Sequence, residues 1–308
     1  MHAWSLVLHG REDEVPELHG VDTDPLATLG TAPTEKYQHA EKQLSIWQMT
    51  IWGLRYLSNK LWNPRQVEES RTVFIPATYV ESLRETALSD IKQSGRNLGD
   101  VPFLSEGDVI CAWWTRQLVR AQISEHSSQT IAINNAFGMR WLLGEDLLPS
   151  SRAYIGNAFC MIPAFLSATD VLKKPLGLVA ASIRQALVNL GTRQQVEAVA
   201  ALNRASQDNG GVALFGDPWM HMIVCTNWTK ADLFSSDFSG ALVGESRHAG
   251  SQQCGRPSFI FAHAFAEGFS MINGFMITGR DVHGNVWLHG ILRSEVWPAI
   301  EQRIGGMA

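Results

Sequence analysis

The stretch SEGDVICAWWTRQLVRA, residues 105–121, has the start and the spacing of a buried helix. Ser105 followed by Asp108 is the pattern of a capping box, in which the two residues exchange side-chain to backbone hydrogen bonds at a helix N-terminus. Ile110, Trp114 and Leu118 then recur every four residues, which places them on one helix face. We therefore expect a helix here that buries its tryptophans.

Other segments alternate between helix-like and strand-like patterns, so the chain is expected to be a mixed α/β protein. Helical spacing continues through Tyr79–Ile91, Val179–Leu190 and Glu295–Ile304, and Thr192 with Gln195 is a second capping box after the helix-ending Gly191. Strands are expected at residues 72–75, 130–134, 220–226, 258–265, 270–278 and 286–291. The last two are expected to form a hairpin, because Asp281, His283, Gly284 and Asn285 between them favour a turn.

Residues 45–62 form a further expected helix that has two interpretations. Its main apolar stripe is Trp47, Ile51, Leu54, Leu57 and Leu61, and a second set is Trp52, Tyr56 and Trp62 with the basic residues Arg55 and Lys60. Trp and basic residues together are typical of a helix on a membrane surface. A helix packed between two lobes is also apolar nearly all round, and we favour this interpretation.

Composition excludes several classes of protein. The net charge is -5, the pI is near 6.1, and there is no dense run of Lys and Arg, so a nucleic-acid partner is not expected. No apolar stretch is long enough to span a membrane, and the N-terminus lacks the pattern of a secretory signal. The four cysteines are far apart, which favours buried thiols in the cytoplasm over disulfides or a metal site.

Common catalytic signatures are absent from the sequence, which argues against the enzyme classes that short motifs identify most readily. The sequence has no GxGxxG, no phosphate-binding loop, no GxSxG and no HExxH. His221, His263 and His289 lie in or beside apolar strands without evident metal-binding companions. We interpret each as a hydrogen-bonded structural histidine rather than a metal ligand or a base.

Four short motifs follow one another along the chain in an order that can be compared with that of known families. They are the helix at 105–121, Tyr154-Ile155-Gly156-Asn157, Thr226-Asn227-Trp228 and Asp237-Phe238-Ser239-Gly240-Ala241. This succession resembles the BAHD acyltransferases, especially their fungal natural-product members, in which a YFGN-like loop, a Thr/Ser-x-Trp strand end and a DFGWG loop follow in the same order. The end of the chain, GFMITGRDVHGNVWLHGILRSEVWPAI, is similar to the family's final hairpin and helix.

The resemblance implies a fold, a cosubstrate and a reaction. The fold would be chloramphenicol-acetyltransferase-like, with lobes built of a mixed β-sheet covered by helices and a tunnel between the lobes. Residues 1–65 would be a remnant of the first lobe with the crossover, and residues 66–308 the complete C-terminal lobe. No bound cofactor is implied; acyl-CoA would be the cosubstrate, and a histidine of an HxxxD motif would act as base toward an acceptor alcohol or amine.

The chain departs from the family pattern in two places. The HxxxD motif would lie just before the matching region, so the chain is expected to be N-terminally truncated and its catalytic residues are unknown. His9 and Asp13 have the spacing of an HxxxD motif, but we interpret this match as coincidental and do not expect His9 to be the catalytic base. The DFGWG loop has lost its Trp, although Asp237, Phe238 and Gly240 remain as a structural motif, with Asp237 expected to hold an arginine.

The resemblance assigns substrate or CoA binding to Asn157, Thr226, Trp228 and Ser239. For Asn157 the alternative is a turn residue with a left-handed backbone, and for Trp228 it is a core position. The expected function is acyl transfer from acyl-CoA to an oxygen or nitrogen of a small hydrophobic natural product, in a cytoplasmic monomer of secondary metabolism. The alternative is a non-catalytic or repurposed family member that binds a small hydrophobic ligand without acyl transfer.

Overall fold

The structure is a computed structural model that describes residues 1–62, 67–95, 103–243, 254–261 and 272–305. At its centre lies a six-stranded mixed sheet with the order β1-β6-β5-β4-β2-β3. The strands β2, β4 and β5 run parallel to one another, and the other pairings are antiparallel. The bounds are β1 Glu68–Ile75, β2 Thr130–Gly138, β3 Phe159–Ser167, β4 His221–Asn227, β5 Gly274–Arg280 and β6 Val286–Arg293.

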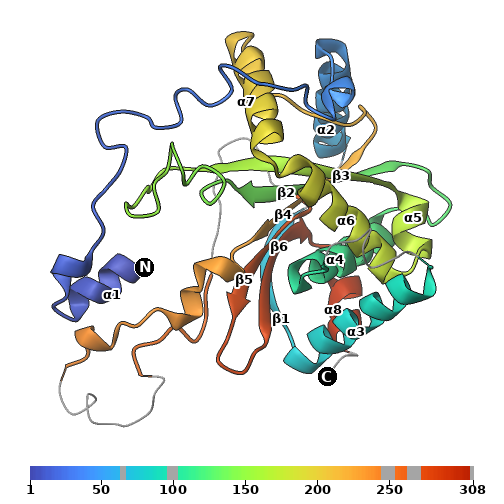
Figure 1. The fold of residues 1–308 in the computed structure, drawn as a ribbon. Helices are drawn as coiled ribbons and strands as arrows, with labels where there is room; N and C mark the ends of the chain where they lie inside the picture. The colour runs from blue at the N-terminus through green and yellow to red at the C-terminus, as the bar shows by residue number, and fades with distance from the viewer. Residues whose placement is uncertain (63–66, 96–102, 244–253, 262–271, 306–308) are drawn as a thin grey trace.

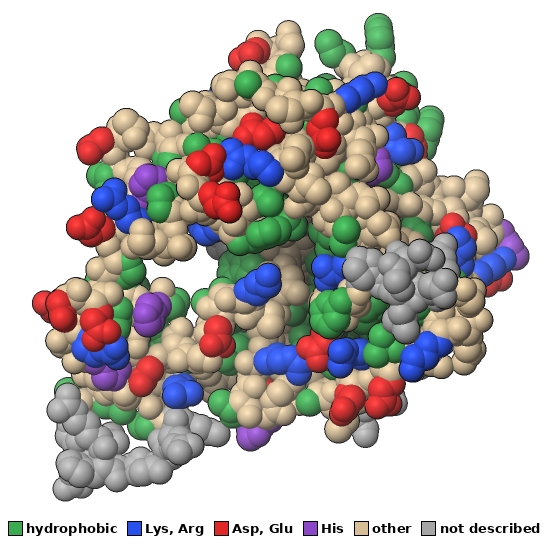
Figure 2. Space-filling view, viewed as in Figure 1, with side chains coloured by type: hydrophobic (Ala, Val, Ile, Leu, Met, Phe, Trp, Pro, Cys, Tyr) green, Lys and Arg blue, Asp and Glu red, His purple; other side chains and the backbone are tan. Residues whose placement is uncertain are grey.

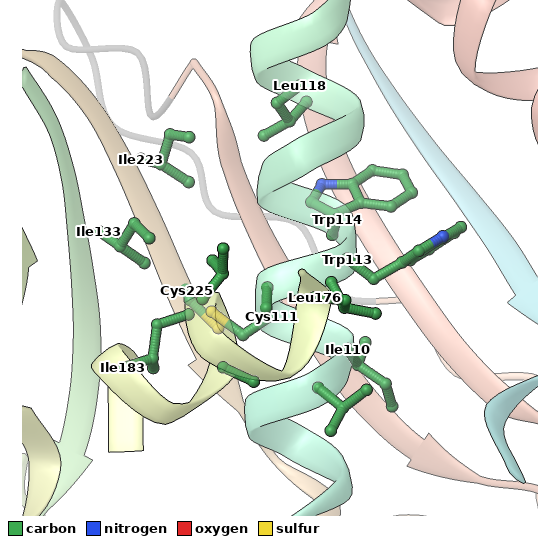
Figure 3. Close-up of a cluster of buried hydrophobic side chains, with 14 of the residues drawn as sticks. Ile110, Cys111, Trp113, Trp114, Leu118, Ile133, Leu176, Ile183, Ile223 and Cys225 are labelled. Atoms are coloured by element: carbon green, nitrogen blue, oxygen red, sulfur yellow. The ribbon is translucent and has the colours of Figure 1, made fainter. Parts of the chain in front are cut away.

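Helices cover one face of this sheet, as Figure 1 shows. They are α3 Ala77–Gln93, α4 Glu106–Gln122, α5 Ala168–Lys173, α6 Leu176–Leu190 and α8 Trp297–Gly305. The main hydrophobic core lies between these helices and the sheet, where Trp114 and Ile183 meet Ile133 and Ile223 (Figure 3). The expected mixed sheet with a helical layer is therefore confirmed.

The capping box at the start of α4 is confirmed and also ties two helices together. The Ser105 hydroxyl accepts a hydrogen bond from the Asp108 amide at 3.3 Å, and Asp108 Oδ2 accepts one from the Ser105 amide at 2.8 Å. Arg184 of α6 donates to the same carboxylate oxygen from Nε at 2.8 Å. Asp108 is only 3% exposed, so a buried charge is neutralised where α4 and α6 meet.

Of the two hydrogen bonds expected for the capping box at Thr192 and Gln195, only one forms. Thr192 accepts a hydrogen bond from the Gln195 amide at the start of α7 (Arg193–Asp208), as expected. The Gln195 side chain does not return to Thr192, because it donates to Glu35 Oε1 at 2.6 Å and accepts from the Gln38 amide at 2.8 Å. Gln195 thus holds the N-terminal segment onto α7, a long-range contact that local spacing does not reveal.

Strand β3 is an element that the sequence analysis did not predict. Pro163 lies in the middle of this strand, and proline cannot donate a backbone hydrogen bond to a sheet. Because β3 is the outermost strand, one of its sides has no strand partner and the missing N–H is tolerated there. The predicted hairpin of β5 and β6 is confirmed, with the Gly284 amide donating to Asp281 O at 3.0 Å in its turn.

The strand expected at residues 258–265 falls partly on residues that the structure does not describe. Residues 262–265 of the strand expected at 258–265 lie outside the described ranges, and residues 258–261 form no regular element. The first residues of the strand expected at 270–278 are likewise outside, and β5 begins at Gly274.

Helix α2 (Ile46–Trp62) forms as expected but presents its main apolar stripe outward. Trp47 is 78% exposed and Leu54 is 61% exposed, whereas Trp52 and Tyr56 of the second set are half-buried and stack on each other. Arg55 reaches across to the carbonyl of Pro218 at 2.9 Å. Within the described residues α2 is packed on one side only, so its place between two lobes stays a prediction.

The N-terminal residues pass along one side of the molecule from α1 (His2–Leu8) to α2 (Figure 1). They attach to α7 through side chains, since Glu197 accepts from the Gly30 amide at 2.6 Å and Arg204 donates to Leu29 O at 2.7 Å. Residues 1–62 thus rest on the sheet-bearing part of the chain. The proposed boundary between residues 65 and 66 stays a prediction.

Candidate functional site

The C-terminal end of β4 carries two of the predicted site residues. The Trp228 indole Nε1 donates a hydrogen bond to Thr226 Oγ1 at 3.0 Å, and the Trp228 amide donates to Ile277 O at 2.8 Å. Trp228 is 39% exposed, so it is not a core residue. Because β2, β4 and β5 are parallel, their carboxyl ends meet at this one edge of the sheet.

Thr226 points to the face of the sheet opposite to the main layer of helices, a face on which α2 packs near Ala132. Side chains alternate along a strand, and Ile223 and Cys225 point toward the helices (Figure 3). Met222, Val224 and Thr226 therefore point to the opposite face, where they are only partly buried. Figure 2 shows the molecule hollowed between the N-terminal segment and the sheet, with hydrophobic side chains on the wall of the hollow.

A second group of predicted residues gathers where α1 meets the short helix η5 (Ser239–Ala241). His9 Nε2 lies 3.1 Å from the Ser239 hydroxyl and 3.8 Å from Asp237 Oδ2. The other ring nitrogen, Nδ1, lies 2.7 Å from the carbonyl oxygen of Ser5. His9, Ser239 and Asp237, which sequence reasoning treated separately, therefore form one cluster.

The Ser5 carbonyl determines how His9 can bond. A carbonyl only accepts, so Nδ1 must carry the proton that it donates to Ser5. In the neutral ring Nε2 is then an acceptor for the Ser239 hydroxyl, and in the protonated ring it donates toward Ser239 or Asp237. This arrangement links the end of α1 to η5 in either state.

Asp237 is an ionised anchor of this loop. The Ser239 amide donates to its Oδ1 at 2.8 Å. Hydrogen bonds from the Ser239 side chain and amide, followed by the charges of His9 and Arg256, lower the pKa of Asp237 below its ordinary value. Arg256 acts on Asp237 only through its charge, so the expected contact of Asp237 with an arginine stays a prediction.

Phe238 and Gly240 of the same motif have structural tasks. The Phe238 amide donates to Gly255 O at 2.8 Å, which closes the loop. A side chain at position 240 would place its Cβ 2.1 Å from the backbone oxygen of Leu8. Glycine at 240 therefore permits the close approach of α1, a relation that the motif alone does not reveal.

Asn157 lies apart from both groups. It is exposed, just before β3, and its backbone φ is not positive, so the left-handed turn interpretation is wrong. Arg140 holds the preceding residues by donating to Gly156 O at 2.7 Å. Ala136 of β2 pairs with Met161 of β3 on one side and with Thr226 of β4 on the other. Asn157 precedes Met161 in the chain and therefore lies past this row of paired residues, with β2 between its strand and β4. The structure does not bring Asn157 to the other predicted residues.

A cavity of about 660 Å³ lies at the edge strand β3 and was not found from the sequence. Its walls come from the N-terminal segment, from β3 and from α6, and the lining side chains are Gln38, His39, Lys42, Pro163, Ala164, Phe165, Ala181, Ser182, Gln185, Ala186, Asn189 and Leu190. No short motif could have revealed it, because these three segments are far apart in the chain.

The buried histidines differ from each other. His289 is 2% exposed and lies 2.6 Å from the Ser70 hydroxyl and 2.9 Å from the Thr72 hydroxyl, so the prediction of a hydrogen-bonded structural histidine is confirmed for it. At His221 the Nε2 atom is buried and has no hydrogen-bond partner among the described residues, so this ring nitrogen does not fit the prediction. His263 lies outside the described residues.

The described part of the chain contains neither a cluster of metal-ligating side chains nor a helix that could span a membrane. No group of three or more His, Cys, Asp or Glu side chains in it could hold a metal ion. None of its helices combines the length and the apolar character needed to cross a bilayer. The cysteines in the described ranges are free thiols, and Cys111 and Cys225 are buried.

Comparison with known proteins gives close sequence relatives, although no family model matches the chain. The acetyltransferase adrJ of Penicillium rubens is 39% identical over 99% of this chain and 62% of its own length. A protein named transcriptional regulator calD, from Penicillium decumbens, is also 39% identical, over 98% of this chain and 60% of its own length. The chain thus spans about three fifths of the length of these curated relatives.

Solved structures share the fold at low sequence identity. TRI101 of Fusarium graminearum, in complex with coenzyme A and T-2 mycotoxin, matches 92% of this chain and 55% of its own chain with a TM-score of 0.63 at 15% identity. Vinorine synthase matches 78% of this chain and 48% of its own with a TM-score of 0.52 at 12% identity. The chain is thus similar in sequence to fungal acetyltransferases, and it shares its fold with the BAHD-type acyltransferases TRI101 and vinorine synthase.

Proposed function

We propose that this chain belongs to an acyltransferase that moves an acyl group from acyl-CoA to an oxygen or nitrogen of a small hydrophobic natural product in fungal secondary metabolism. The observation that carries the proposal is the match to fungal acetyltransferases over nearly the whole chain. We further propose that it works as a monomer in the cytoplasm, where free thiols such as Cys111 remain reduced.

The reaction would form a bond between the acceptor and the acyl carbon and break the carbon–sulfur bond of the thioester. The acceptor oxygen or nitrogen attacks the thioester carbonyl, its proton leaves to a base, and the carbon–sulfur bond breaks to release the CoA thiol. Charge develops on the carbonyl oxygen during the attack, so a hydrogen-bond donor near it accelerates the reaction. The open sheet face beside Thr226 and Trp228 supplies a partly apolar wall for the acceptor.

The roles of the predicted residues follow from their positions. Trp228 offers an exposed aromatic surface that the hydrogen bond to Thr226 holds in place. Ser239 lies at the α1–η5 junction, where His9 and Asp237 fix its hydroxyl, so we assign it a positioning role. His9 is occupied by Ser5 and Ser239, which favours a structural task over that of the catalytic base.

A second candidate function is binding without acyl transfer. It is supported by relatives named transcriptional regulators, calD at 39% and sdnM at 33% identity. Such a protein would keep the hollow for a hydrophobic ligand and lack the transfer step.

Acetyl-CoA distinguishes the two candidates. The chain is titrated with acetyl-CoA by calorimetry, and release of the CoA thiol is followed with a panel of hydroxylated terpenoids as acceptors. Binding with acceptor-dependent thiol release and an acetylated product in mass spectra supports the proposal. Failure to bind acetyl-CoA overturns it, and acetyl-CoA binding with no product from any acceptor favours the second candidate.

A further inference from the structure

The outer edge of strand β3 carries backbone groups that bond to no other strand. The Ala168 amide donates to Gln129 O at 2.9 Å just past the end of β3, so this pair of residues is hydrogen-bonded. Bonded and non-bonded pairs alternate along an antiparallel ladder, so the even-numbered residues of β3 bond to β2. The backbone groups of Pro163 and Phe165 therefore point away from the sheet, and no hydrogen bond within the described residues reaches them.

The β3 cavity lies directly beside this edge, because Pro163 and Phe165 line it. Its two walls approach from the two faces of the sheet. Helix α6 packs on the face of Ala164 in the main core, whereas Phe165 points to the other face, where α2 packs. The N-terminal segment 38–42 forms the wall on that face, with the ring centres of His39 and Phe165 5.2 Å apart. The cavity is thus an opening along the edge of the sheet.

The wall formed by the N-terminal segment is positively charged. Among the described residues that line the cavity, Lys42 carries a charge and none has a carboxylate. The exposed Lys42 ammonium lies 5.1 Å from the centre of the Phe165 ring, and the nearby Glu41 pairs with Lys36 instead, at 3.0 Å. The charge of Lys42 is therefore available to a carboxylate that enters beside Phe165.

The wall formed by α6 is polar but uncharged. Ser182, Gln185 and Asn189 recur at helical spacing and line the cavity. Gln185 Nε2 donates to Asn189 Oδ1 at 2.7 Å, which leaves the Gln185 oxygen as an acceptor and the Asn189 NH₂ group as a donor. Short polar side chains suit this wall, because it offers them both an acceptor and a donor.

An extended chain beside β3 would meet both walls at once. Side chains alternate between the two faces of a strand, so every second side chain would point toward Lys42 and the others toward α6. Antiparallel pairing places one residue directly opposite Phe165, and the two exchange both backbone hydrogen bonds. The amide two residues away then donates to Pro163 O. The side chain opposite Phe165 shares the face of the Phe165 ring, within reach of Lys42.

We propose that the β3 cavity is a docking site for an extended segment of a partner protein, which adds a strand to the edge of β3 and places an acidic side chain against Lys42. Main-chain bonds to Phe165 and Pro163 hold the segment, and the α6 wall favours short polar side chains at alternate positions. The cavity volume of about 660 Å³ is in the range of sites for small ligands, so a few residues of the segment enter it. The inference goes beyond acyl transfer and does not depend on it, since β2 separates β3 from the β4 end that carries Thr226.

The probe is the acetylated and amidated heptapeptide Thr-Val-Thr-Asp-Thr-Val-Thr, whose Asp and Val side chains share one strand face and whose Thr side chains share the other. Calorimetry on the full chain measures its binding. Lys42→Gln is expected to weaken binding about tenfold, the effect of losing one charge-assisted hydrogen bond. Asn in place of the peptide Asp should have the same effect on the unaltered protein. Lys36→Gln is the matched control, because Lys36 pairs with Glu41 outside the cavity.

A second pair of peptides tests the bonds to the strand edge. N-methylation of the Asp amide removes the donor to Phe165 O and is expected to weaken binding about tenfold or more. N-methylation of the next Thr amide is the control, because adjacent amides of a strand point to opposite sides and this one would face away from β3. Both peptides keep the carboxylate, so they separate strand pairing from simple charge attraction.

The outcomes are distinct. Binding that falls with Lys42→Gln, with the Asn peptide and with the N-methylated Asp, while the protein variants keep their melting temperatures, supports the inference. The absence of heptapeptide binding at millimolar concentration overturns it. Equal binding of the two N-methylated peptides, or equally tight binding of free succinate, identifies a site for small carboxylates without strand pairing and also overturns it.

Discussion

The Nε2 atom of His9 lies 3.1 Å from the hydroxyl oxygen of Ser239, although 230 positions separate the two residues in the chain. Together with the close approach of Leu8 to Gly240, this contact attaches α1 to η5. Since few other elements touch α1, its position depends on this small polar cluster.

Ser239→Ala is therefore expected to loosen α1 without unfolding the sheet. The variant loses the hydroxyl that meets His9, so we expect a cost of about 1 kcal/mol and faster proteolytic cleavage near residues 8–14. Limited proteolysis followed by mass spectrometry measures this. Ser235→Ala is the control, because Ser235 bonds only to Asp232 of its own turn at 2.6 Å; equal cleavage rates for the two variants would contradict the assigned role of Ser239.

Gly177→Ala is expected to separate α3 from α6. A Cβ at position 177 would lie 2.1 Å from the backbone oxygen of Ala87, which cannot move independently of its helix. We expect a loss of about 2 kcal/mol in the free energy of unfolding, measured by urea denaturation. Gly53→Ala in α2 is the matched control, since a Cβ there meets nothing within 4 Å and should raise stability by about 0.5 kcal/mol through helix propensity.

Arg184→Leu is expected to cost about 3 kcal/mol, because it leaves the buried carboxylate of Asp108 without its cationic partner. Lys174→Leu at the exposed pair with Asp170 should cost less than about 1 kcal/mol. Urea denaturation of both variants gives the comparison. Similar losses in the two would show that burial of Asp108 does not set the energy of its ion pair.

His221 is expected to make stability fall in mild acid. Burial, then the charges of Arg55 and Arg293, lowers the pKa of His221 from 6.5 to about 4 in the folded protein. Between these values the unfolded chain binds a proton that the folded chain does not, so stability is full above pH 6.5 and falls as the pH drops toward 4. The loss amounts to at most about 3 kcal/mol.

Melting temperatures between pH 7 and pH 4.5 measure this effect, in a window above the range in which most carboxylates titrate. His221→Gln should flatten the curve, and the exposed His126→Gln should leave it unchanged. A wild-type curve that is flat over this window would refute the assignment.

Trp228→Phe tests the end of β4 under the proposed function. The change removes the Nε1 donor that binds Thr226 Oγ1, so the ring loses its fixed position. We expect kcat/KM for acyl transfer to fall by about tenfold or more. Thr226→Val should produce a similar loss, and the double variant should lose little more, because both changes break one bond. Trp219→Phe, at the opposite end of β4, is the control.

Local chemistry made much of the fold predictable from the sequence. The Ser105–Asp108 capping box, the helix spacing of α3, α4 and α6 and the turn chemistry at Asp281 and Gly284 depend on residues close together in the chain, and each forms as expected. Strand β3 was not predicted, and its Pro163 is tolerated because β3 is an edge strand, a property of the whole sheet. The orientation of α2 was likewise undecided by its pattern, since both of its faces are apolar.

The candidate site was predictable only in pieces. Thr226 and Trp228 are two positions apart, so their contact follows from the strand end, whereas the approach of His9 to Ser239 depends on how α1 returns to η5. The β3 cavity joins three distant segments, and no residue in it belongs to a recognisable motif. The role of a charged residue such as Lys42 cannot be predicted until it is known whether a carboxylate lies beside it in the cavity lining.

Gln195 is also the residue that completes this cavity, although it does not line it. By binding Glu35, Lys36 and Gln38, it sets the N-terminal wall in place next to His39 and Lys42. The same wall is joined to residues 214–216 by an isolated β-bridge, in which the Gly216 amide donates to Lys42 O at 2.8 Å. Because the wall is not a strand of the six-stranded sheet, related chains can change its residues, and with them the ligand that fits, while the sheet and its helices stay the same.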